Sequence, residues 1–142
     1  MRFMIIVKAS AESEAGVMPS SEQIAGFGQF NEDLIQAGVL LAAEGLQSSS
    51  RGARVKLEGG KLVVKDGPFA ETKELVAGFW LIDVKSYEEA LEWTKRIPYG
   101  EGDEYELRKV FEASDFPADT VPADALEKEV AWRQANQKPI SN

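Results

Sequence analysis

The stretch "VAGFWLIDV", Val76 to Val84, decides the fold of this chain. It is the most strand-like run in the sequence, because apolar, aromatic and β-branched residues fill it almost without interruption. A helical pattern follows at once, with a capping-box pair at Ser86 and Glu89 and an end at Pro98. The stretch therefore predicts a buried strand that leads into an amphipathic helix.

Strand and helix patterns also alternate on both sides of this run. A second helix is expected from Ser21, because Ser20 and Gln23 form a capping box and Gly38 provides a stop. Further strands are expected at residues 2–8, 39–46 and 104–112. The order β-α-β-β-α-β predicts an α+β domain with the ferredoxin-like arrangement.

A β-hairpin at residues 53–65 is inserted between the second and third of these core strands. Its two alternating runs are joined by a glycine turn. The segment from Arg51 to Lys65 carries five basic residues and one acidic residue. Arg51 and Arg54 can grip a carboxylate or phosphate, or the charges can simply keep an edge hairpin from aggregating.

Two helices can cover only one face of a four-stranded sheet. The strands are apolar on both sides, so we expect a homodimer packed sheet to sheet. Residues 113–142 are rich in proline and lack the strand-like runs of the preceding residues. They predict a linker followed by an amphipathic helix from about Pro122 to Gln134. The apolar face of that helix, Leu126, Val130 and Trp132, needs this domain or a second copy to lie on.

Composition excludes several functions. The chain has 142 residues, enough for one domain, and it contains no cysteine and no histidine. Thiolate sites and Ser-His triads are therefore excluded, and acid–base chemistry must use carboxylates, Lys, Tyr or water. The net charge of −8 disfavours nucleic-acid binding. No signal peptide or membrane span is expected, and the cytoplasm is the simplest location.

The motif "DGPFAETKE", followed by "AGFWLI" and preceded by "MRFMIIVKA" and "GVLLAAEGL", resembles the DGPF branch of the YCII-related proteins over roughly residues 1–112. The resemblance implies a ferredoxin-like fold that dimerises as an α/β barrel, and no settled activity. Some relatives lie beside, or are fused to, extracytoplasmic-function sigma factors, which implies a regulatory connection to a sigma factor and nothing about chemistry. Smaller relatives carry a histidine–aspartate pair suspected of catalysis, and this chain lacks the histidine.

The stretch "KDGPFAETKE", Lys65 to Glu74, is the candidate site. As a purely structural turn, Asp66 would cap backbone N–H groups, Pro68 would begin a short helix and Phe69 would anchor the turn in the core. As a site, Asp66, Glu71 and Glu74 would form the rim of a pocket floored by Phe69 and Trp80. Such carboxylates could shift each other's pKa or hold a divalent cation, although no metal loop is matched.

Glu44 lies in an apolar strand and has three interpretations: a strand end facing water, an ion pair with Arg51, Arg54 or Lys73, or a member of the site. The leading hypothesis is a homodimer that binds a small anionic or aromatic molecule, as a cofactor-free lyase or isomerase without a metal. Asp66 and Glu44 would then carry protons, and Arg54 or Lys73 would position the ligand. The alternative is a non-catalytic adaptor or sensor for a sigma factor or another protein.

Overall fold

The computed structural model describes the backbone of residues 1–142 and every side chain except that of Lys73. The helices are α1 (Ala11–Glu14), α2 (Ser21–Gln36), α3 (Tyr87–Lys95) and α4 (Ala123–Asn136), with single 3-10 turns at η1 (Ser49–Arg51), η2 (Thr72–Glu74) and η3 (Ala113–Asp115). The strands are β1 (Arg2–Lys8), β2 (Leu40–Gly45), β3 (Ala53–Glu58), β4 (Lys61–Asp66), β5 (Val76–Asp83) and β6 (Tyr105–Lys109). The expected α+β class is confirmed.

The main sheet has the strand order β2-β5-β1-β6, and every neighbouring pair is antiparallel. β5 is central, as its sequence indicates, and pairs with β1 along its whole length, from Arg2 opposite Asp83 to Lys8 opposite Val76. One irregularity in each partner interrupts the register, between Val7 and Lys8 in β1 and between Leu40 and Ala42 in β2. β1 and β2 therefore flank β5, with the helix α2 connecting them.

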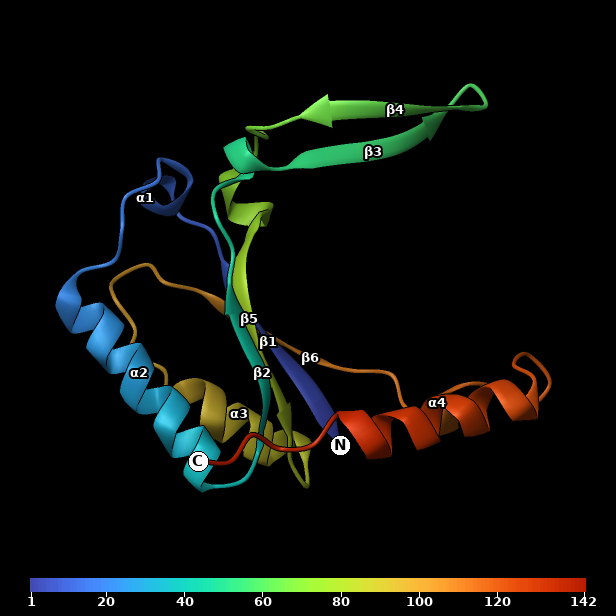
Figure 1. Cartoon of the computed structure of the whole chain (residues 1–142). Helices are drawn as coiled ribbons and strands as arrows, with labels where there is room; N and C mark the ends of the chain where they lie inside the picture. The colour runs from blue at the N-terminus through green and yellow to red at the C-terminus, as the bar shows by residue number, and fades with distance from the viewer.

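One face of this sheet is covered by α2 and α3 (Figure 1). The period-2 alternation of the strands turns Phe3, Ile5 and Ile82 toward these helices, where each is at most 1% exposed. The other members of this core are Phe30, Leu34, Val39, Leu40, Trp80, Val84, Ala90 and Ile97. The opposite face carries Met4 and Ile6, which lie opposite Leu81 and Phe79 of β5 in the register. No helix covers that face in the same way.

The helix starts follow their local capping residues. At α2 the capping box is complete, because Ser20 Oγ accepts from the Gln23 N–H and Gln23 Oε1 accepts from the Ser20 N–H. At α3 only half of the expected box forms. Ser86 Oγ accepts from the Glu89 N–H at 3.1 Å, but the Glu89 carboxylate turns to the Lys85 N–H instead.

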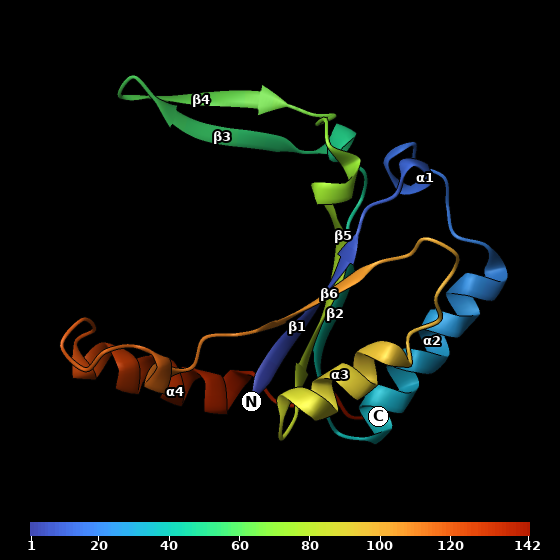
Figure 2. The same ribbon diagram turned by 180° about the vertical axis from the view of Figure 1, so that it is seen from behind.

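The hairpin β3–β4 forms a separate two-stranded sheet that projects away from α2 and α3 (Figures 1 and 2). Gly59 and Gly60 make its turn with φ of +57° and +76°, values that only glycine adopts readily at two successive positions. Every residue of both strands is exposed. We call residues 53–66 the arm.

The helix α4 projects on the same side of the sheet as the arm, at the opposite end of the strands (Figures 1 and 2). None of its residues is buried. Its C-terminal end is tied to β1 by Arg2, which is 7% exposed and donates to Gln137, to the Glu112 carboxylate and to the Phe111 carbonyl. Burial alone would raise the pKa of Glu112, but the hydrogen bonds and charge of Arg2 hold it below its usual value. No helix is long and apolar enough to cross a membrane in the described part of the chain.

Candidate functional site

The base of the arm is held where two segments meet: η1, and the DGPF turn of Asp66–Phe69. The Gly67 N–H donates to the Gly52 carbonyl at 3.0 Å, which closes the arm at its root. A Cβ atom on Gly67 would lie 1.7 Å from the carbonyl oxygen of Ser49, so no side chain fits at this position. The glycine of the motif is therefore required by a close backbone approach.

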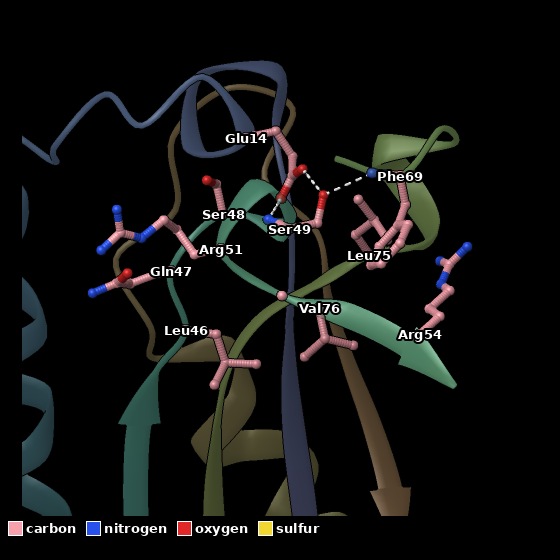
Figure 3. A pocket seen from close by; sticks show the side chains of 11 residues that line it. Glu14, Leu46, Gln47, Ser48, Ser49, Arg51, Arg54, Phe69, Leu75 and Val76 are labelled. Atoms are coloured by element: carbon pink, nitrogen blue, oxygen red, sulfur yellow. Dashed lines mark hydrogen bonds between the residues drawn. The ribbon is translucent and has the colours of Figure 1, made fainter. Parts of the chain in front are cut away.

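Ser49 joins this turn to the N-terminal part of the chain (Figure 3). Its Oγ accepts a hydrogen bond from the Phe69 N–H at 3.0 Å and donates to one oxygen of the Glu14 carboxylate. The Ser49 N–H donates to the other oxygen of Glu14 at 2.9 Å. The side-chain and backbone hydrogen bonds from Ser49 lower the pKa of Glu14. The hydrogen bonds from Ser49 to Glu14 and from Phe69 to Ser49 thus hold together three segments that are far apart in the sequence.

An open hollow of about 400 Å³ lies beside this junction (Figure 3). Its apolar wall consists of Leu46 at the end of β2, Leu75 and Val76 at the start of β5, and the ring of Phe69. Polar groups from η1 and its neighbours complete the lining: Glu14, Gln47, Ser48, Ser49, Arg51, Gly52 and Arg54. The hollow therefore combines an apolar floor with two arginines.

The charges of the hollow favour an anion. The Arg54 guanidinium lies 4.0 Å from the centroid of the Phe69 ring, a cation–π contact that holds its planar group in place. Arg51 lines the same hollow. Glu14 is the one carboxylate among the lining residues, and both of its oxygens already accept hydrogen bonds from Ser49. The Arg54 guanidinium can therefore present N–H donors to a carboxylate or phosphate on one side of the hollow, whereas the Arg51 side chain extends away from it on the opposite side (Figure 3).

The geometry of the hollow supports proton transfer less well than it supports anion binding. A lowered pKa makes Glu14 a weak base at neutral pH, and no histidine exists to activate Ser49. Burial, with Asp103 and Tyr99 nearby, raises the pKa of Tyr105 to about 12, so that phenol stays protonated. Among the residues with described side chains, no group of three or more acidic residues could hold a metal ion.

Two of the residues expected at the site, Arg54 and Phe69, line the hollow. Three do not: Asp66, Glu44 and Glu71 are all exposed and absent from its lining. Strand pairing explains the first two, because Asp66 ends β4 opposite Ala53 and Glu44 lies opposite Phe79 near the end of β2. Glu71 has a left-handed backbone, with φ of +62°.

Trp80 lies in the core and does not floor the hollow. Its Nε1–H donates to the Asn31 side chain at 2.6 Å, and its ring packs against Phe27, Phe30 and Tyr105. The alternation of β5 turns Trp80 to the helix-covered face, since Ile82 on the same face is fully buried. The expected ligand contact of Lys73 lies outside the described side chains.

The rest of the expected turn chemistry also differs from the structure. The Gly67–Pro68 peptide bond is cis, and the next helical turn, η2, begins only at Thr72. No hydrogen bond to the Asp66 carboxylate occurs among the described side chains, so it does not cap the turn. Glu14 and Ser49, which do hold the turn, carry no local sequence pattern, because their contact spans 35 residues.

The class of protein is thus an α+β domain with an inserted hairpin and a hollow at the hairpin's root. The YCII-related domain model matches residues 1–114, and the chain belongs to this family. A protein of Rhizobium meliloti (strain 1021), described as uncharacterized, is 41% identical over 63 residues, which cover 44% of this chain and 51% of the relative. The chain therefore matches about half the length of this curated relative.

Among solved structures, the chain is similar to the 5-chloro-2-hydroxyhydroquinone dehydrochlorinase TftG of Burkholderia phenoliruptrix AC1100 in complex with 2,5-dihydroxybenzoquinone. The identity is 14% and the TM-score is 0.37, with 81% of this chain and 98% of that chain covered.

Proposed function

We propose that this chain is a cytoplasmic, ferredoxin-like homodimer of the DGPF branch that binds a small organic anion in the hollow beside the DGPF turn. The observation that carries the proposal is the presence of Arg51 and Arg54 in one hollow with an apolar floor. Such a lining suits a molecule with a carboxylate or phosphate at one end and an apolar or aromatic body at the other.

The two arginines have different roles in this proposal. Arg54 is oriented by the Phe69 ring beneath it, so its N–H groups are available to an anion with little loss of side-chain freedom. Arg51 ends the η1 turn that Ser49 begins, and its side chain extends from the side of the hollow opposite Arg54 (Figure 3). The aliphatic side chains of Leu46 and Val76 receive the apolar body of the ligand.

The homodimer is proposed from the open face of the main sheet. Met4, Ile6 and Phe79 on that face are only partly buried within one chain. A second copy packed about 10 Å away would cover them, as in other stacked sheets, and would give the α/β barrel. Residues 1–112 would form this domain and residues 113–142 its extension.

Binding, without turnover, is the activity that the geometry supports best. A cofactor-free lyase or isomerase would need a free carboxylate facing the ligand, and Asp66 and Glu44 do not line the hollow. The carboxylate that does line it, Glu14, is engaged with Ser49. Asp66 and Glu44 keep a catalytic role only if a ligand extends from the hollow to them.

Thermal unfolding in the presence of benzoate, 4-hydroxybenzoate and inorganic phosphate tests the proposal. A ligand at 100 times its dissociation constant stabilises the fold by about 2.7 kcal/mol, which raises Tm by roughly 5–10 °C for a chain of this size. The shift should vanish in the double variant Arg51→Ala, Arg54→Ala and persist in Lys95→Ala, which removes a distant charge from α3. Equal shifts in all three proteins would contradict binding in the hollow.

A second candidate is the non-catalytic adaptor, and the exposed apolar residues of α4 favour it. Val130 is 40% exposed and Trp132 is 60% exposed. A sigma factor of the extracytoplasmic-function group would be the partner to test. Its retention by the immobilised chain should be lost in Val130→Ser, Trp132→Ser, while the thermal shift with small anions stays unchanged.

A further inference from the structure

The arm leaves an apolar face uncovered. The register of β3 and β4 places Val55 opposite Val64 and Leu57 opposite Leu62, so these four side chains share one face. They are 62–73% exposed. A two-stranded hairpin without a covering layer is at best marginally stable in water. The arm therefore requires another surface on this face.

The other face of the arm is basic. Arg54 pairs with Lys65 and Lys56 with Val63, and a shallow hollow runs along these residues. None of the ion pairs between described side chains involves a residue of the arm. The arm carries four basic and two acidic residues, an excess charge of +2 in a chain of −8, so the remainder carries −10. An apolar surface therefore suits one face of the arm, and acidic groups suit the opposite face.

Both kinds of group occur on this chain, at the opposite end of the sheet. Residues 112–129, which we call the acidic segment, contain six acidic residues and one basic residue. Asp119 and Glu127 in it have no ion pair with any described side chain. Exposed apolar residues accompany the segment: Phe116, Val130 and Trp132 are 40–60% exposed.

The arm and the acidic segment cannot meet within one chain, because they project from opposite ends of the strands (Figures 1 and 2). They do project on the same side, toward the open face of the sheet. A two-fold axis that lies in this open face and crosses the strands would bring the arm of each copy to the α4 end of the other.

We propose that each arm lays its apolar face on the exposed apolar residues of α4 of a second copy and turns its basic face toward the acidic segment of that copy, so that the homodimer is held by two reciprocal clasps. This inference rests on the homodimer proposed above and adds its orientation. The lengths agree: β3, with six residues, and α4, with fourteen, each span about 20 Å. Both exceed the spacing of about 10 Å between stacked sheets, so each reaches past the partner's sheet.

Charge reversal tests the clasp by analytical ultracentrifugation. Reversing the arm (Lys56→Glu, Lys65→Glu) should weaken dimerisation about tenfold or more, because like charges would then face each other. Reversing the acidic segment (Asp119→Lys, Glu127→Lys) should do the same. The chain that carries all four changes should dimerise like the wild type, and so should an equimolar mixture of the two reversed chains. A matched control, Lys85→Glu, Lys95→Glu on the helix-covered side, should leave the dimer unchanged.

Cross-linking provides a measurement that does not depend on charge. The chain has no cysteine, so engineered thiols report only on themselves. Chains with Leu57→Cys, mixed with chains with Trp132→Cys, should be joined by a bismaleimide into a mixed dimer. Joining of Leu57→Cys chains to each other instead would place arm against arm and overturn the clasp.

The remaining outcomes separate the two proposals. A wild type that sediments as a dimer, with a dissociation constant that neither reversal changes, overturns the clasp but leaves the homodimer. A wild type that stays monomeric overturns both, and leaves the anion site to the thermal-shift experiment. Retention of a 20-base-pair DNA by the monomer through Lys56 and Lys65 would assign the arm to nucleic acid and equally overturn the clasp.

Discussion

The arm and its root differ in how many contacts they make within one chain. At the root, backbone approaches the backbone so closely that only Gly67 fits, and Ser49 is bonded on both sides. A few residues further, every position of β3 and β4 is exposed. The contrast shows that intrachain contacts fix the direction in which the arm leaves the sheet, while its surface is left for another molecule.

The largest expected effect is at the root. In Gly67→Ala the new methyl group collides with the Ser49 carbonyl, so the DGPF turn must shift. Overpacking against a fixed backbone should lower the free energy of unfolding by about 3 kcal/mol, measured by urea denaturation. Gly28→Ala is the matched control: no atom lies within 4 Å, and the change inside α2 should stabilise by about 0.5–1 kcal/mol. Equal stability of both variants would show that the root is not tightly held.

The next largest effect is expected at Trp80, and it tests whether this residue belongs to the core or to the hollow. Trp80→Phe leaves the Asn31 side chain without its donor and should cost about 2 kcal/mol of stability. The thermal shift caused by small anions should stay as large as in the wild type, since Trp80 does not line the hollow. A loss of that shift in a folded Trp80→Phe protein would return Trp80 to the ligand site.

A smaller effect, and one that depends on pH, is expected at the other end of the sheet. The pKa of Glu112 is lowered in the folded chain, so its contribution to stability is present above the pKa of the unfolded chain and is lost as pH falls through the folded value. Glu112→Gln should therefore cost about 1 kcal/mol at pH 7, with partial exposure taken into account, and much less at pH 3. Urea denaturation at both pH values measures this, and an unchanged difference would exclude the ionic contribution.

The smallest energies are expected in the arm itself. In a dilute, monomeric sample its amides should exchange with solvent with an opening free energy near zero, while those of β1 and β5 are protected. Concentrating the sample should slow exchange in residues 53–66 if a second copy covers them. Hydrogen exchange followed by mass spectrometry distinguishes these regions. Full protection of the arm at the lowest concentration would mean that one chain stabilises it alone.

The parts of the fold that were predicted from sequence are those specified by neighbours in the chain. The capping box of Ser20 and Gln23 begins α2, and Gly59 with Gly60 sets the register of the hairpin. The site was predicted only in part. Arg54 and Phe69 come together because the hairpin returns the chain to the root of the arm, where both residues lie. The contact of Glu14 with Ser49, in contrast, joins segments far apart in sequence and leaves no periodic trace.

The residues that were placed differently share one physical cause. A strand turns successive side chains to opposite faces, so an apolar neighbourhood in sequence does not say which face a given residue occupies. Trp80 lies on the helix-covered face with Ile82, whereas Glu44 lies at an exposed strand end. Pairing with β1 decides this phase for β5, and pairing is a property of the folded sheet.

The closed root of the arm also has a consequence for the order of folding. Pairing of β2 with β5 requires closure of the connection from Gly45 to Val76, whose cost grows with the length of free chain. Once the local hairpin has formed, the hydrogen bond from the Gly67 N–H to the Gly52 carbonyl reduces the length of free chain in that connection. Halving the effective loop saves about 0.6 kcal/mol, so the fraction of chains in which the hairpin has formed is expected to pair β5 with β2 more readily. The pairing of β5 with β1, which joins segments farther apart in the sequence, is expected to be the slower step.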